Sequence, residues 1–521
     1  MNVQPTAALL AGRWRERVTF NSISGIVRFA VVTLAYVVAY PLLLHSFGPA
    51  LFGLWALLGS ATNYAVLGDF GFANSLTILS ASPARSGAPA EIQRLSNSAS
   101  AIMLAAGGAM AILAYGLRGI IPELLRVPAQ LQPDAVLLLT GLAGSLWIIL
   151  LSNVYTALLS GAQRMDLTNV VQACGAVVNA FGIVLVVEEG WGVAGLVLSG
   201  LCSAVVMWAS GVWLVHRVLG IPVRVVPLIH WATAVELSKM GVQLYIAALA
   251  ALLMEPSVKF LLARYGSLAM VSHFEIGARV VMQGRSVFQQ VLLPILPAAA
   301  LVVGDAPQVR MLFSRAVRFL WLVAVPGFVI LGVNAGDIIH IWMRQPIPEA
   351  EFALRWLAFG WLLNTLTIPA YLIAQGTGRV RQAMVCALTQ GVIATGCTLL
   401  FVRKFGLSAA IVSLCIGLCI AAAYILFCYL RAFPTPASQF LGDRPVLQLF
   451  APILLAGGLA AMRYWFPSGL LLPLLANSMI LVAGYFFFLY QVSTRGGGPR
   501  RFAEWYLPSQ LVRAVFAEVK K

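Results

Sequence analysis

Residues 135–164 read AVLLLTGLAGSLWIILLSNVYTALLSGAQR, an apolar run that closes on Gly161-Ala-Gln-Arg164. A helix of about 20 apolar residues is long enough to cross a hydrocarbon core about 30 Å thick. Runs of this kind recur along the whole chain, which is 60% hydrophobic and only 10% charged. Soluble domains carry about 25% charged residues, so this much apolar surface must face lipid. The sequence therefore predicts an all-α polytopic membrane protein.

We expect about 14 transmembrane helices, each set by one apolar run. They cover residues 26–47, 51–79, 96–117, 135–160, 168–187, 193–215, 240–262, 269–299, 317–336, 353–375, 382–402, 406–430, 446–466 and 470–491.

The basic residues are distributed unevenly between the two sides of the predicted membrane. Four of the 34 Lys and Arg residues lie inside spans, 22 lie on the side that holds both ends, and 8 lie on the other side. Because basic residues concentrate in cytoplasmic loops, we expect both termini in the cytoplasm. The net charge of +16 does not indicate a nucleic-acid partner, since no loop combines aromatic with basic residues.

The seven cysteines all fall within predicted spans. Nothing in their spacing resembles a metal-ligand set, and none lies in an external loop where a disulfide would be expected. We expect no metal, no cofactor and no catalytic residue.

Two halves of the chain carry the same landmarks in the same order. Gly161-Ala-Gln-Arg164 returns 215 positions later as Gly376-Thr-Gly-Arg379, and Trp191-Gly192 returns as Phe405-Gly406 at an offset of 214. Each copy holds six spans, an even number, so both copies enter the membrane from the same side. The sequence thus predicts two six-helix lobes related by a parallel pseudo-two-fold repeat, a pattern found in transporters.

Pro41 and Pro256 lead the two copies, again 215 positions apart. Proline removes a backbone hydrogen bond and bends a helix, so we predict that both residues act as hinges. The alternative is that membrane helices simply tolerate them. The predicted organisation is an N-terminal lobe at 1–216, a cytoplasmic linker at 217–237, a C-terminal lobe at 238–431, an extra helix pair at 446–491 and a cytoplasmic tail with an amphipathic helix at 492–521.

Four basic residues inside the spans are the candidate functional residues: Arg28, Lys259, Arg279 and Arg285. A charge at the centre of a membrane helix costs at least about 2.5–3.5 kcal/mol on insertion scales, so such residues point to a function. Glu255 and Glu275 precede Lys259 and Arg279 by four positions. Each pair could therefore neutralise itself along its own helix.

Arg285 has no acid within one helical turn, and Arg28 lies close enough to the cytoplasmic end to extend toward water. The guanidinium fork matches phosphate oxygens bidentately. We therefore predict a substrate-binding site of Arg28, Arg279, Arg285 and Glu275, in which the arginines bind a diphosphate, and we expect Lys259 to pair with Glu255.

Several segments resemble bacterial polysaccharide flippases of the multidrug/oligosaccharidyl-lipid/polysaccharide exporter (MOP) superfamily. They are Gly48-Pro-Ala-Leu-Phe-Gly-Leu-Trp55, Leu67-Gly-Asp-Phe-Gly-Phe-Ala73, Phe274-Glu-Ile-Gly-Ala-Arg279 and Leu293-Pro-Ile-Leu-Pro297, within a resemblance that covers roughly residues 20–430. It implies two six-helix lobes in a V around a central cavity. Such flippases also carry two extra helices that can form a groove for a lipid tail.

The resemblance implies cavity arginines on the first and eighth helices, which Arg28 and Arg279 match. A third cationic position, on the second helix, is known in peptidoglycan-precursor flippases. It is absent here, where Asn63 and Tyr64 are the nearby polar residues.

The resemblance implies a transporter that flips a polyprenyl-diphosphate-linked oligosaccharide across the bacterial inner membrane for surface polysaccharide. The expected partners are this lipid-linked substrate, membrane lipids, and a polysaccharide polymerase or glycosyltransferases. Two alternatives stay open: a multidrug or cation antiporter of the same superfamily, and a membrane glycosyl polymerase or ligase. The second is an enzyme, and it would need a larger external loop than those near 118–134 and 337–352, as well as a nucleophile and base.

Overall fold

A computed structural model describes most of the 521-residue chain. The described residues are 4–60, 72–81, 89–162, 164–220, 230–231, 233, 235, 237, 254–292, 295–296, 299, 302–436, 438–439, 450, 452–459, 461, 478–480 and 482–487. They divide into two compact units, Met1–Leu252 and Leu253–Lys521.

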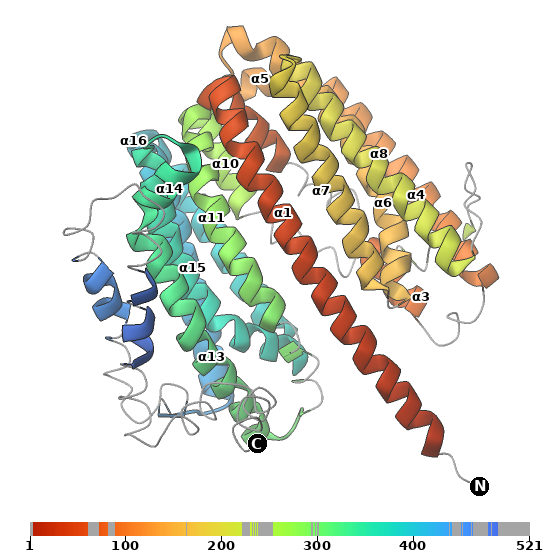
Figure 1. Cartoon of the computed structure of the whole chain (residues 1–521), viewed down its shortest axis with the longest axis vertical. Coiled ribbons are helices and arrows are strands. Elements are labelled where there is room, and N and C mark those ends of the chain that lie inside the picture. Colours follow the sequence, from red (N-terminus) through yellow and green to blue (C-terminus); the bar gives the residue numbers. More distant parts are fainter. Residues whose placement is uncertain are drawn as a thin grey trace. The chain divides into compact units, whose positions relative to one another are not determined.

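All the regular elements in the described ranges are helices (Figure 1). Unit 1 holds α1 (Gln4–Ser60), α3 (Phe72–Ala81), α4 (Pro89–Gly116), α5 (Ile120–Leu124), the 3-10 helix η2 (Ala129–Leu131), α6 (Gln132–Gly161), α7 (Met165–Glu188) and α8 (Gly192–Leu219). Unit 2 holds α10 (Glu255–Tyr265), α11 (Leu268–Leu292), α13 (Ala306–Val333), α14 (Ala335–Met343), α15 (Pro348–Gly376) and α16 (Val380–Ala432).

Eight of the described helices are long and apolar enough to cross a membrane. They lie at Val27–Gly59, Ala90–Gly116, Ala129–Gly161, Met165–Glu188, Gly192–Leu219, Ala306–Val333, Pro348–Gly376 and Val380–Ala432. The prediction of an all-α polytopic membrane protein is confirmed. The count of fourteen stays a prediction, because several of the expected spans include residues outside the described part.

Helix α6 forms the centre of unit 1. It packs against α4, α8 and α3, and Figure 1 shows α4, α6, α7 and α8 running side by side. Leu150, Val154 and Leu158 of α6 are buried in one apolar cluster with residues of the neighbouring helices. Gly141 lies so close to Val197 that an added Cβ would clash, which brings α6 and α8 together. Small residues allow this close packing of membrane helices.

Helix α15 has the same central role in unit 2. It packs against α11, α13 and α16, and 72% of its most apolar window is buried, the largest share among the eight spans. Gly277 of α11 lies against the α15 backbone: a Cβ there would be 2.7 Å from the backbone nitrogen of Leu354 and 2.8 Å from the carbonyl oxygen of Ala350. Any larger residue would push α11 away from α15.

The repeated motif adopts the same turn in both units. The backbone N–H of Arg164 donates to the carbonyl of Leu159 at 2.9 Å, and that of Arg379 donates to Ala374 at 2.7 Å, with the partners again 215 positions apart. Each arginine precedes the first residue of the next helix, α7 or α16. The local backbone therefore repeats along with the sequence.

The second landmark repeats as well. Gly192, at the start of α8, has φ of 63°, and Gly406, at the kink inside α16, has φ of 53°. Glycine adopts this left-handed conformation without the steric cost that a side chain adds. The long α16 therefore corresponds to α7 and α8 joined across one glycine.

The two predicted hinges lie in different local settings. Helix α1 continues through Pro41, and its non-helical residue is Gly48, with φ of 73° and ψ of 169°. Pro256 lies in the first turn of α10, where its missing N–H removes no helical bond. Residues 240–253, which precede it in the expected span 240–262, lie outside the described part. The hinge role of both prolines stays a prediction.

Candidate functional site: a buried chain of ion pairs

Four charged residues of α10 and α11 are joined into one chain, which we call the ion chain: Glu255, Lys259, Glu275 and Arg279. Nζ of Lys259 lies 2.6 Å from Oε1 of Glu255 and also donates to Oε2 of Glu275. Nε of Arg279 donates to Oε1 of Glu275 at 3.0 Å, and Nη2 of Arg279 donates to the same oxygen. The charges alternate along the ion chain and sum to zero.

The link between Lys259 and Glu275 joins two helices across 16 sequence positions. The sequence predicted two separate pairs, Glu255 with Lys259 and Glu275 with Arg279, and both exist. Their fusion was not predicted, because only residues three or four apart on one helix can be paired from sequence spacing.

Burial differs along the ion chain. The side chains of Lys259 and Glu275 are each 2% exposed, whereas Glu255 is 22% and Arg279 is 27% exposed. Removing a charge from water costs several kcal/mol unless partners compensate, so the two central charges depend on each other. Arg279 is the more exposed cation of the ion chain.

The position of the ion chain is fixed by packing around it. Gly277 lies between Glu275 and Arg279 in sequence, and its contact with the backbone of α15 holds this part of α11 in place. The Phe274 ring centroid lies 6.0 Å from Nζ of Lys259, so an aromatic face also lines the buried lysine. Cations near aromatic faces are stabilised by the ring quadrupole.

Arg285 lies further along α11 and is held by an aromatic ring rather than by an acid. Its guanidinium carbon is 4.3 Å from the centroid of the Trp361 ring on α15, and its Nη1 donates to Gln289 at 3.0 Å. Glu255 and Tyr371 lie within electrostatic range of it. Its Nε is buried without a hydrogen-bond partner in the described part of the chain. The stacking on Trp361 and the hydrogen bond to Gln289 therefore hold Arg285 in place.

Arg28 lies on α1 in unit 1 and donates from Nη1 to the amide oxygen of Gln172 on α7. That partner is neutral, so the positive charge of Arg28 is not cancelled by this bond. The Nε of Arg28 is buried and makes no hydrogen bond to any described residue. Of the predicted site residues, the structure brings Glu275 and Arg279 into direct contact, and Arg28 belongs to the other unit.

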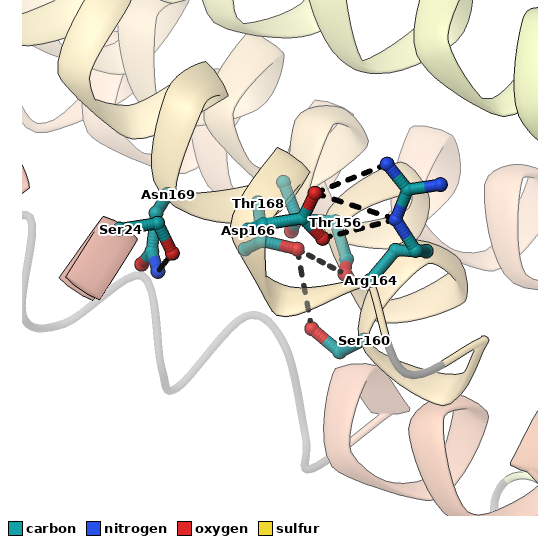
Figure 2. A network of polar contacts seen from close by, with 7 residues as sticks. All are labelled: Ser24, Thr156, Ser160, Arg164, Asp166, Thr168 and Asn169. Carbon is teal, nitrogen blue, oxygen red and sulfur yellow. Dashed lines mark hydrogen bonds and ion pairs between the residues drawn. The ribbon is translucent and has the colours of Figure 1, made fainter. Parts of the chain in front are cut away.

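A second polar cluster, which we call the turn clamp, surrounds the α6–α7 turn (Figure 2). Arg164 donates to both carboxylate oxygens of the buried Asp166, from Nε and from Nη2, each at 3.0 Å. This hydrogen bond to Asp166 raises the pKa of the Arg164 guanidinium above its ordinary value.

The other members of the turn clamp join neighbouring helices: Ser160 pairs with Thr168 at 3.3 Å, and Asn169 donates to Ser24 of α1 at 2.9 Å. The turn clamp therefore fastens α1 and α6 to the start of α7.

An apolar groove of about 560 Å³ lies between α13, α15 and residues 452–459 of unit 2. Phe328 and Val333 line it from α13, Phe359 and Leu362 from α15, and Ala456 from the later segment. Arg355 is its charged lining residue. The chemistry of the walls suits a hydrocarbon chain with a polar group near Arg355.

Comparison with known proteins gives a family and a fold. Residues 43–345 match the model of a family described as polysaccharide biosynthesis protein. No curated protein sequence matches the chain.

The fold is that of MOP-superfamily transporters. Lipid II flippase MurJ, in an inward closed conformation, matches with a TM-score of 0.71 at 12% identity, over 91% of this chain and 99% of that one. An inward-facing multidrug resistance MATE family transporter matches with a TM-score of 0.62 at 17% identity, over 78% of this chain and 94% of that one. A MOP superfamily transporter from Pyrococcus furiosus, described as having a binding pocket of reverse polarity, matches with a TM-score of 0.57 at 15% identity, over 80% and 95%.

These matches confirm the resemblance and the fold class that the sequence predicted. The family model covers more than half of the chain, and the helices adopt the MOP architecture. The chain belongs to the polysaccharide biosynthesis protein family and has the fold of the MOP superfamily.

Proposed function

We propose that the protein flips a polyprenyl-diphosphate-linked oligosaccharide from the inner to the outer leaflet of the bacterial inner membrane. The product would serve the assembly of surface polysaccharide such as O-antigen, capsule or exopolysaccharide. The observation that carries the proposal is Arg279, a guanidinium at the more exposed end of a buried ion chain in a polysaccharide biosynthesis protein. Arginine binds phosphate oxygens through paired, charge-assisted hydrogen bonds.

Arg279, Arg285 and Arg28 would bind the diphosphate at different stages of an alternating-access cycle. Glu275 would hold Arg279 when no substrate is bound. The lobes at 1–216 and 238–431 would rock about Pro41 and Pro256, with 217–237 as the linker between them. Both termini would stay in the cytoplasm, and a polysaccharide polymerase or glycosyltransferases would act next to the transporter.

The apolar groove of unit 2 is the proposed binding site of the prenyl tail. Its walls are mostly hydrocarbon, and Arg355 lies among them. A lipid tail in this groove would keep its contact with apolar surface while the diphosphate and the sugars cross. The helix pair expected at 446–491 would complete the groove.

The test replaces Arg279 with Ala in cells that depend on this protein for surface polysaccharide. We expect surface polysaccharide to fall at least about 10-fold, the effect of losing one charge-assisted interaction, while lipid-linked oligosaccharide accumulates inside. Arg279→Lys keeps the charge without the fork and should lie in between. Arg315→Ala is the matched control, because Arg315 is an exposed arginine in the N-terminal half of α13. Undiminished polysaccharide in Arg279→Ala would remove Arg279 from the site.

A multidrug or cation antiporter is the second candidate, favoured by the structural similarity to MATE transporters. Such a transporter needs an acidic group that can bind a cation, and Glu275 is already paired with two internal cations. The same strains separate the two functions. Normal polysaccharide together with lost drug resistance in Arg279→Ala would favour the antiporter.

A further inference from the structure

Glu275 occupies the Nε–Nη2 edge of the Arg279 guanidinium, so a diphosphate that binds through this edge must displace the carboxylate. Two of its nitrogens, Nε and Nη2, donate to Oε1 of that carboxylate. Glu275 is 2% exposed, so water cannot replace a departing guanidinium. Leaving a buried charge without a partner is strongly unfavourable. Glu275 is therefore a built-in competitor of an anionic ligand for this edge of Arg279.

Lys259 occupies the other oxygen of the same carboxylate. It donates to Oε2 of Glu275, so Glu275 keeps one cation when Arg279 turns to a ligand. Lys259 is itself 2% exposed and lies beyond Glu275 as counted from Arg279, so it is not placed to contact the ligand. Lys259 also forms an ion pair with Glu255, so its electrostatic attraction is shared between two carboxylates.

We propose that Lys259 is a positioning residue for diphosphate binding: it holds Glu275 at the moment when Arg279 moves from that carboxylate to the phosphate. This role rests on the proposed function. In the empty protein the ion chain is Glu255, Lys259, Glu275 and Arg279. In the loaded protein Lys259 neutralises Glu275, and Arg279 pairs with the ligand. The affinity for diphosphate is then set by how strongly Lys259 holds Glu275.

The test uses the purified full-length protein in detergent micelles and farnesyl diphosphate as the probe, with farnesol as the uncharged control. Affinity is measured by isothermal titration calorimetry. Glu275→Gln removes the competitor and should tighten binding about 10-fold, the value of one charge-assisted hydrogen bond. Glu255→Gln removes one of the two carboxylates that contact Lys259 in the described structure, so Lys259 should hold Glu275 more strongly and the affinity should rise by a smaller factor.

The double variant Lys259→Met/Glu255→Gln leaves the neutral pair Glu275–Arg279. It should weaken binding about 10-fold relative to Glu255→Gln, because Glu275 then loses Lys259 and depends on Arg279 among the four residues of the ion chain. Arg279→Gln should abolish the preference for farnesyl diphosphate over farnesol. Lys404→Met is the control, since Lys404 is an exposed lysine on α16 and outside the ion chain, and the affinity of this variant should equal that of the wild type.

Tighter binding in Glu275→Gln and Glu255→Gln, together with weaker binding in the double variant, distinguishes a positioning role from general destabilisation. A purely structural loss would weaken binding in every variant. Wild-type affinity in both Glu255→Gln and Glu275→Gln, with binding lost in Arg279→Gln, overturns the role of Lys259 and leaves the diphosphate site standing. A wild type that binds farnesyl diphosphate no better than farnesol overturns both. If the double variant does not fold, Glu255→Gln decides: unchanged affinity there overturns the proposal.

Discussion

The α6–α7 turn of unit 1 and the α15–α16 turn of unit 2 have the same backbone and opposite electrostatics. Arg164 and Arg379 make equivalent backbone hydrogen bonds, 215 positions apart. In unit 1 the residue two positions later is Asp166, which binds Arg164. In unit 2 the equivalent residue is Arg381, and Arg379 instead stacks over Phe433, with 4.8 Å from its guanidinium carbon to the ring centroid.

The difference shows that the two copies share a fold without sharing the interactions that close each turn. Unit 1 fastens its turn with a buried carboxylate. Unit 2 has Arg379 and Arg381 at the two equivalent positions, and Arg379 stacks on the Phe433 ring. Three substitutions test this comparison, from the largest expected effect to the smallest.

Asp166→Ala should give the largest loss, about 3 kcal/mol of stability, because hydrogen bonds to charged groups contribute about 1.5–3 kcal/mol. The measurement is the thermal-unfolding midpoint of the purified protein in micelles. Glu91→Ala is the matched control: Glu91 pairs with Arg94 at 2.9 Å, but both side chains are well exposed. Exposed pairs contribute about 0–1 kcal/mol, so the control should unfold close to the wild type. Equal midpoints for both variants would contradict the turn clamp.

Gly417→Ala should give the next effect, a loss of about 2 kcal/mol from overpacking. In both units the helix segment that follows the turn contacts the next helix segment at equivalent positions. In unit 1 Ser203 donates to the carbonyl of Gly175 at 2.8 Å. In unit 2 a Cβ on Gly417 would lie 2.7 Å from the carbonyl oxygen of Gln390. The control is Gly396→Ala, where the added methyl group meets no atom within 4 Å. An unfolding midpoint of Gly417→Ala equal to that of Gly396→Ala would show that the contact between Gly417 and Gln390 has room for a methyl group.

Arg381→Asp should give the smallest effect and the opposite sign. It places a carboxylate where unit 1 has Asp166, so it should stabilise the turn by about 0.5 kcal/mol through a new pair with Arg379. The midpoint should rise slightly at low salt and return to the wild-type value at high salt. A decrease would show that stacking on Phe433 holds Arg379 away from the new carboxylate.

Much of the fold follows from hydropathy and glycine positions. The expected boundaries near 47 and 51 and near 402 and 406 coincide with Gly48 and Gly406, the two glycines at which long helices leave helical geometry. The regions near 118–134 and 337–352, expected as loops, contain the short helices α5 and α14. Such segments are too short to give an apolar period of their own, so their helicity depends on packing that a sequence pattern does not contain.

The candidate site was predictable in its residues but not in its connections. Buried charge on an apolar helix singles out Arg279 and Glu275 from the sequence alone. The bond between Lys259 and Glu275 and the stacking of Arg285 on Trp361 join different helices, and no spacing rule places two helices against each other. Gly277 was visible in the sequence, yet its importance appears only once the α15 backbone lies against it.

The alternation of charge along Glu255, Lys259, Glu275 and Arg279 has an electrical consequence. A uniform transmembrane field exerts no net force on a group whose charges sum to zero, whereas moving one elementary charge across 100 mV involves about 2.3 kcal/mol. The ion chain would thus add little to the voltage dependence of the movement that the proposed function requires, and Arg28 and Arg285, whose described partners are uncharged, would contribute most of it.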